Sequence, residues 1–323
     1  MIRIYLSFIL FSLYFIFPTL CFSYIDDLDA KSAVVVDGQT GKILYGKNPH
    51  LKHPPASTTK LVTAMIALEH LEPEKVVVIS KKAAKTVSVE PKLKEGQIYT
   101  VRDLVYLALM RSVNSATVAL AEAVAGDEKR FVKLMNQKVR SIGARETKFT
   151  NSSGLPGRGQ YTTVYDLTKI ISHALTYPII KDAINTRIYL IRSSDGEQYF
   201  IQNTNQLLWS DDNMIGGKTG YTKSARHCFV VASKIDGRVV YAAVLGASNR
   251  EKLWKDTEFL FAKAKDVFLG KQEPVVKLSD EKIVKAKYKS KKSYKAIKVK
   301  SKKIKKNKKI KKTKDATSYT RSI

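Results

Sequence analysis

Hydrophobic and polar residues follow two different periods along this chain, and the periods separate its two ends from its middle. Near the start, β-prone residues fill 32–37 and 42–45 on either side of the turn residues 38–41. Towards the other end, residues 226–245 hold two β-rich runs joined by the Ile-Asp-Gly turn at 235–237. Because turn residues between two extended runs favour chain reversal, each arrangement predicts a β-hairpin.

The middle of the chain shows the helical period instead. Apolar residues recur at helical spacing over 100–125, with an interruption at 112–114, and again over 127–142 and 163–175. A closing helix is predicted over 251–269. Runs of this length with an apolar stripe favour helices over strands. The pattern therefore predicts a helical insertion between two strand-forming ends.

One further helix carries candidate chemistry. It must begin after Pro54 and Pro55, because proline cannot occupy a helix interior, and this places Ser57 in its first turn with Lys60 one turn later on the same face. A hydroxyl beside an amine on a buried helix can act as nucleophile and base, and the helix N-terminus adds donors for an oxyanion. Alone the signal is weak, since Ser-x-x-Lys recurs at 279–282, to which we assign no role.

The first residues predict export. A weakly basic opening at 1–3 precedes an uncharged apolar run over 4–17, and the small residues Cys21 and Ser23 follow. This order is typical of a cleaved secretory signal peptide, which we place at 1–23. The alternative is an uncleaved membrane anchor, but the run is shorter than the roughly 20 residues that a spanning helix needs.

Charge separates a C-terminal tail from the rest. The whole chain has a formal net charge of +28, and residues 271–323 contain 21 Lys or Arg against four acidic residues. Such a composition cannot bury enough apolar surface to offset its ordering entropy, so we expect a disordered lysine-rich tail after a catalytic domain at 24–270. Its charge fits an anionic wall polymer or a membrane surface, whereas export argues against nucleic acid. A merely solubilising segment is the alternative.

The cysteines and histidines indicate neither a disulfide nor a metal site. Once the signal peptide is removed, Cys228 is the single remaining cysteine, in a strand-like run where a buried structural role is expected. No His/Cys cluster has metal-ligand spacing, so we expect no metal and no cofactor.

Two later motifs support a catalytic role for the Ser-x-x-Lys motif at Ser57. Ser112-Val-Asn114 lies between two predicted helices, and Lys218-Thr219-Gly220 lies near a strand end. Each has a plain structural explanation, as a helix cap or a surface turn, yet the three in this order resemble the motif set of penicillin-binding proteins and β-lactamases. Over residues 30–269 the chain resembles a D-alanyl-D-alanine carboxypeptidase, a low-molecular-weight penicillin-binding protein. Further stretches that resemble this family are 151–156, 160–166 and 203–209.

The resemblance implies a fold and a compartment. The fold is of the β-lactamase/transpeptidase-like α/β (α+β) class, in which a mainly antiparallel sheet is covered by helices beside a helical lobe, with the cleft between them. The substrate is the peptidoglycan stem peptide, and β-lactam antibiotics are covalent inhibitors. The protein is accordingly expected in the periplasm or at the cell wall, on the outer face of the cytoplasmic membrane.

The resemblance also implies catalytic roles. Ser57 attacks the carbonyl between two terminal D-alanines, and Lys60 takes its proton. The amine must be neutral for this, and burial together with nearby Lys218 would lower its pKa. Ser112 relays the proton towards the leaving amine.

Five further residues are implied in substrate binding. Asn114 holds the substrate backbone with its side-chain amide, and Lys218 supplies positive charge. Thr219 hydrogen-bonds the free carboxylate of the substrate, and Gly220 completes the motif. The backbone N–H groups of the nucleophile and of Tyr221 form the oxyanion hole. Arg250 is placed like the carboxylate-binding arginine of the family, with a surface arginine at a helix start as the alternative.

Two positions depart from the family pattern, and two other functions stay open. Many relatives carry His where Tyr221 stands and Gly where Val113 stands, which bears on the deacylation step.

One alternative is a β-lactamase of the same fold, although no Glu is evidently placed to activate a deacylating water. The other is an inactive peptidoglycan-binding protein that acts through its basic tail, against which the complete motif set argues.

Overall fold

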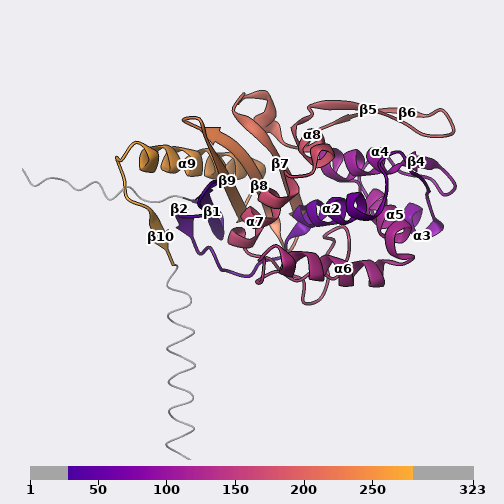
Figure 1. Ribbon diagram of the computed structural model, residues 1–323, viewed down its shortest axis with the longest axis horizontal. Coiled ribbons are helices and arrows are strands. Elements are labelled where there is room, and N and C mark those ends of the chain that lie inside the picture. Colours follow the sequence, from indigo (N-terminus) through magenta and orange to yellow (C-terminus); the bar gives the residue numbers. More distant parts are fainter. Residues whose placement is uncertain (1–27, 279–323) are drawn as a thin grey trace, which may run out of the picture.

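A six-stranded sheet forms one half of the computed structural model, which describes residues 28–278 (Figure 1). The strand order is β10-β2-β1-β9-β8-β7, and every neighbouring pair is antiparallel except β10 with β2. The predicted signal peptide, the tail beyond residue 278 and the second Ser-x-x-Lys match all lie outside the described residues. The strands of this sheet are β1 (Ser32–Asp37), β2 (Ile43–Lys47), β7 (Met214–Thr222), β8 (Arg226–Ile235), β9 (Arg238–Ala247) and β10 (Val275–Lys277).

Both predicted hairpins are confirmed. β1 pairs with β2, and β8 pairs with β9 through a register that ends at Ile235 opposite Arg238. The two residues between them, Asp236 and Gly237, have φ values of 48° and 75°. A two-residue loop with positive φ at both positions matches the right-handed twist of the strands, which explains why Asp-Gly suits this turn.

The helical elements surround the sheet and build a second lobe beside it. Two small antiparallel ribbons, β3 (Val76–Val78) with β4 (Ile98–Thr100) and β5 (Ile188–Arg192) with β6 (Gln198–Gln202), lie against that lobe. The α-helices are α2 (Lys60–His70), α3 (Lys81–Lys85), α4 (Val101–Tyr106), α5 (Asn114–Ala125), α6 (Glu128–Ser141), α7 (Val164–Ala174), α8 (Pro178–Asn185) and α9 (Arg250–Phe268). The tighter and wider turns are the 3₁₀ segments η2 (Ala56–Thr59) and η4 (Gln206–Trp209) and the π-helical segment η3 (Leu107–Arg111).

Both faces of the sheet are buried, and β1 shows how. Val34 and Val36 belong to the larger apolar cluster that continues into the helical lobe, whereas Ala33 and Val35 belong to a cluster under α9. Successive side chains of a strand point to opposite faces, so a strand covered on both sides reads as one continuous apolar run.

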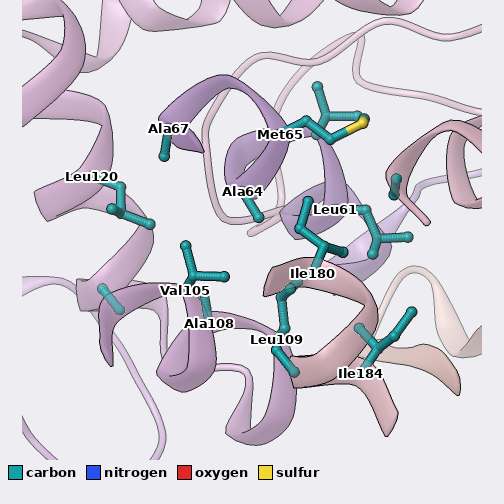
Figure 2. Packing of buried hydrophobic residues seen from close by; sticks show 14 of the residues in the cluster. Leu61, Ala64, Met65, Ala67, Val105, Ala108, Leu109, Leu120, Ile180 and Ile184 are labelled. Atoms are coloured by element: carbon teal, nitrogen blue, oxygen red, sulfur yellow. The ribbon is translucent and has the colours of Figure 1, made fainter. Parts of the chain in front are cut away.

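Helix α2 lies at the centre of the helical lobe (Figure 1). Every residue from Lys60 to Ala67 is buried, as expected for a helix that is apolar all round. Figure 2 shows Leu61 and Met65 of α2 packed in one cluster with Leu109 of η3 and Ile180 of α8. This packing holds the N-terminal end of α2, and hence Ser57, at a fixed place between the two lobes.

A short helix and a domain boundary differ from the prediction. Helix α8 was not predicted, because Pro178 and a run of eight residues give a short signal. The folded part also extends past the boundary placed at residue 270: Val275 and Val276 of β10 pair with Tyr45 and Gly46 of β2.

No helix of the described residues is long and apolar enough to cross a membrane. The α/β class with a mainly antiparallel sheet is confirmed.

Candidate active site

A strained turn presents Ser57. The preceding residue, Ala56, has a φ of 48°, a left-handed conformation that non-glycine residues rarely adopt. Two side chains stabilise the turn, because the Thr58 hydroxyl donates to the carbonyl of Pro55 at 2.7 Å and the Thr59 hydroxyl to that of Ala56 at 2.8 Å. These threonine side chains add hydrogen bonds to the carbonyls of the turn, and they fix Ser57 just before α2.

Two glycines let neighbouring segments close on this turn. A Cβ added at Gly154 would lie 1.8 Å from the carbonyl oxygen of Ala56, and one added at Gly220 would lie 2.8 Å from the backbone nitrogen of Ser57. No side chain fits in either space. Gly220 thus has a geometric role: it allows strand β7 to lie directly against the turn that carries Ser57.

Lys60 meets three oxygens. Its Nζ atom lies 2.9 Å from Ser57 Oγ, 2.7 Å from Asn114 Oδ1 and 2.6 Å from the carbonyl oxygen of Ser153, and the residue has no exposed surface. Burial, with a smaller effect from the charge of Lys218, holds the pKa of the Lys60 amine well below its usual value. A neutral amine has two N–H groups and one lone pair. With its hydrogens donated to the amide and carbonyl oxygens, the lone pair is left for the Ser57 hydroxyl.

The loop after α3 holds Asn114. Its backbone N–H donates to Ser88 Oγ at 2.8 Å, and its Nδ2 donates to the carbonyl of Val87 at 2.7 Å. Close by, Arg111 Nε donates to the carbonyl of Glu90 at 3.1 Å. The amide of Asn114 therefore has one N–H directed at the loop and a second that remains for a substrate carbonyl.

Lys218 and Ser112 form a second lysine–serine pair. Lys218 Nζ donates to Ser112 Oγ at 3.2 Å and to the carbonyl of Thr219 at 2.9 Å. Burial and then the nearby charge of Arg250 lower the pKa of Lys218 to about 7. Ser112 has a φ of 69° at the end of the π-helical segment η3, and such segments often occur at functional sites.

One cavity of about 270 Å³ brings the predicted residues together. Seven of the nine line it, namely Ser57, Ser112, Asn114, Thr219, Gly220, Tyr221 and Arg250. The other two, Lys60 and Lys218, are buried behind the two serines that they contact.

Eight of the lining residues were not predicted, among them Thr204, His227 and Arg111. Thr204 shares a hydrogen bond of 2.6 Å with Thr219 between their hydroxyls. His227 lies opposite Tyr221 on the neighbouring strand, with 4.5 Å between the ring centroids. Arg111 directly precedes Ser112. Of these residues, Gly154, Leu155 and Thr204 had a signal in the sequence, since they lie in the stretches 151–156 and 203–209 that resemble the family.

Cys228 lies outside this chemistry. It is buried, as predicted, and burial raises the pKa of its thiol to about 12, which keeps it protonated. Among residues 28–278 no group of three His, Cys, Asp or Glu side chains could hold a metal ion.

Comparison with known proteins identifies the family. The model of the D-alanyl-D-alanine carboxypeptidase family matches residues 22–249. The chain belongs to the D-alanyl-D-alanine carboxypeptidase family. It is 34% identical over 226 residues to the carboxypeptidase DacF of Bacillus subtilis. The matched region covers 68% of this chain and 58% of DacF. It is also 34% identical over 246 residues to the carboxypeptidase DacB2 of Mycobacterium tuberculosis, covering 73% of this chain and 82% of DacB2.

The fold agrees with that family. The crystal structure of a D-alanyl-D-alanine carboxypeptidase from Mycobacterium tuberculosis H37Rv superposes with a TM-score of 0.69 at 32% identity, covering 72% of this chain and 90% of the other. The chain spans little more than half the length of DacF. The residues matched by the family model include every lining residue of the cavity around Ser57 except Arg250 and Leu253.

Proposed function

We propose that this carboxypeptidase-family chain removes the terminal D-alanine from peptidoglycan stem peptides through an acyl-enzyme on Ser57. The observation that carries the proposal is the environment of Lys60. The amine is buried, its pKa is lowered, and it lies 2.9 Å from Ser57 Oγ while two carbonyl-type oxygens accept its hydrogens. This arrangement supplies a neutral base beside the nucleophile, as acylation of a hydroxyl requires.

Acylation would proceed in two stages. Ser57 Oγ attacks the penultimate carbonyl carbon as its proton passes to Lys60 Nζ, and the carbonyl becomes an oxyanion near the backbone N–H groups of Ser57 and Tyr221. The oxyanion then reforms the carbonyl, the C–N bond breaks, and the leaving amine of D-alanine takes a proton through Ser112. Water next attacks the ester, giving the shortened peptide and free Ser57.

The free carboxylate of the substrate would lie at the other end of the cavity. Thr219 and Arg250 both line it there, and the buried Lys218 adds positive charge from behind. A carboxylate is bound most strongly by charged donors in a partly desolvated site. If this assignment is right, a substrate with an amidated C-terminus should be turned over much more slowly. Arg250→Ala should reduce turnover more for the free acid than for the amide.

The proposal is tested by D-alanine release. The purified chain should release D-alanine from a peptide that ends in D-Ala-D-Ala, and a fluorescent penicillin should label it covalently. Ser57→Ala should abolish both, whereas Ser224→Ala, a hydroxyl nearby on the β7–β8 turn, should leave both unchanged. Label that persists on the Ser57→Ala variant, or lies at Ser279, would refute the assignment.

We further propose that the protein is exported and acts in the periplasm or at the cell wall. The basic opening, the apolar run over 4–17 and the small residues before Tyr24 support this. N-terminal sequencing of the protein from the cell envelope should begin at Tyr24, and recovery from the cytosol with Met1 intact would contradict it.

We also propose that the lysine-rich tail binds an anionic wall polymer or membrane surface, which its charge supports.

A further inference from the structure

A second cavity lies beside the one that contains Ser57. Its volume is about 450 Å³, and it shares Arg111, Thr204 and Arg250 with the first. Its other lining residues are Gln202, Asn203, Gln206 and Trp209. Asn203, Thr204, Gln206 and Trp209 lie in the stretch 203–209 that resembles the family, and Arg250 is the one lining residue of this cavity that the proposed removal of D-alanine uses.

The position of this cavity relates it to the leaving residue of the substrate. Thr219, the proposed partner of the terminal carboxylate, lines only the first cavity, and Thr204, whose hydroxyl is 2.6 Å from that of Thr219, lines both. The second cavity therefore begins where the terminal carboxylate would be held. The part of a substrate nearest to it is the residue released with the amine.

The walls of the cavity fit a polar, acidic side chain. Two exposed guanidinium groups, Arg111 and Arg250, border it, and Gln202 and Gln206 supply amides. Trp209, whose side chain is 41% exposed, adds an apolar surface for an aliphatic stem. The methyl group of D-alanine occupies almost none of this space. Guanidinium groups bind carboxylates with charge-assisted hydrogen bonds.

We propose that this cavity is a subsite for the side chain of the leaving residue, and that it accepts D-amino acids whose side chain ends in a carboxylate. The inference rests on the proposed function, because it assumes that the terminal carboxylate binds at Thr219. The chemistry is unchanged: the same C–N bond breaks, Ser57 takes the acyl group, and a larger amine leaves.

Three peptides test the subsite, identical except for a last residue of D-Ala, D-Gln or D-Glu. D-Gln and D-Glu have nearly the same shape and differ in charge. We expect kcat/KM for D-Glu to exceed that for D-Gln by about tenfold, the value of one charge-assisted contact. Arg111→Gln should reduce this ratio, and Arg111→Lys should largely restore it. Arg192→Gln, which removes an exposed arginine of β5 outside the cavity, should leave the ratio unchanged.

A filling variant tests the space itself. Gln202→Trp at the end of β6 should occupy the second cavity, so it should reduce turnover of both longer peptides and leave the D-Ala peptide unaffected. Equal rates for D-Glu and D-Gln in the wild type, or failure of Gln202→Trp to discriminate against the longer peptides, would overturn the inference while the proposed function stands. Absence of turnover for all three peptides would overturn both.

Discussion

Lys60 and Lys218 are both completely buried, and the charge of Lys218 adds to burial in lowering the pKa of Lys60. Each amine contacts a different serine, Lys60 at 2.9 Å from Ser57 and Lys218 at 3.2 Å from Ser112. Two like charges in one buried site repel each other, so one amine loses its proton while the other can keep it. We therefore expect the pair to provide a base and a cation behind the same cavity.

The rate of acylation should depend on pH in a bell-shaped manner. Below the lowered pKa of Lys60 the base is protonated and acylation stops, and above the pKa of about 7 the charge of Lys218 is lost. Because the two groups interact, the limbs report on the pair. Labelling rates with a fluorescent penicillin from roughly pH 5 to 10 would measure this.

The variant Lys218→Met separates the two limbs. It removes the group that titrates at about 7, so the alkaline limb should disappear. It also removes a charge that lowers the pKa of Lys60, so the acid limb should move to higher pH. A profile with an unchanged acid limb in this variant would show that the two amines do not interact.

The same variant should be more stable than the wild type at neutral pH. Lys218 has a pKa of about 7 when folded and an ordinary value of 10.5, so the unfolded chain binds more protons between these values. The free energy of unfolding of the wild type should therefore increase from about pH 7 to about pH 10.5. Below pH 7 the full cost of burying the charged Lys218 amine lowers the stability of the folded chain. We expect Lys218→Met to add about 1–4 kcal/mol at pH 7, with a gain that shrinks as pH rises. Thermal unfolding at several pH values would measure it, and a gain independent of pH would contradict the assignment.

Gly154 should be essential for the nucleophile turn. A Cβ at this position would lie 1.8 Å from the carbonyl oxygen of Ala56, so Gly154→Ala must displace the turn that carries Ser57. We expect a large loss of penicillin labelling and a destabilisation well above 1 kcal/mol. Gly159→Ala is the matched control: its φ of 78° is close to the 81° of Gly154, but no atom lies within 4 Å of the added Cβ. The control should lose only about 1 kcal/mol, the strain of a left-handed residue.

Ser88 should act as a positioning residue for Asn114. Its Oγ accepts a hydrogen bond of 2.8 Å from the backbone N–H of Asn114, whose side chain contacts Lys60. Ser88→Ala should lower kcat for D-alanine release about tenfold, the effect of roughly 1.4 kcal/mol, with a smaller change in stability. Thr86→Ala, in the same loop with its hydroxyl bonded to the carbonyl of Lys82, is the control and should leave kcat unchanged. Equal effects of both changes on kcat would remove Ser88 from this role.

Two truncations should distinguish the tail from the folded part. A chain that ends at Leu278 keeps β10, so it should turn over a small peptide normally and be released from cell envelopes at low salt if the tail binds there. A chain that ends at Gly270 loses the pairing of β10 with β2 and should unfold at a lower temperature. Retention of the Leu278 chain on envelopes at low salt would refute the binding role of the tail.

Local patterns predicted the parts of the fold that depend on neighbouring residues. The hairpin around Asp236 and Gly237 needs only a turn pair between apolar runs. Likewise Thr100 caps α4 through the N–H of Asp103, three residues away. The position of Ser57 at a helix start follows from the two prolines before it. In each case the deciding contact lies within about one turn of the chain.

The rest of the site depends on contacts between distant segments. Lys60 donates a hydrogen bond to the carbonyl of Ser153, and Asn114 donates one to the carbonyl of Val87. Because both acceptors are backbone atoms, no pattern of residue types in the sequence indicates these bonds. The left-handed conformation of Arg226, with a φ of 60°, is likewise set by the β7–β8 turn and not by the residue. The second cavity was not predicted for the same reason: Arg111, the segment 202–209 and Arg250 come together only in the fold.

The order of the sheet determines where this enzyme can be attached to a support. β10 lies at one edge, and β7, which carries Lys218 and Thr219, lies at the opposite edge. Neighbouring strands are about 4.8 Å apart, so five steps place Leu278 on the order of 24 Å from the reactive strand. Molecules immobilised through Leu278 would therefore keep the entrance to Ser57 open to a large polymer.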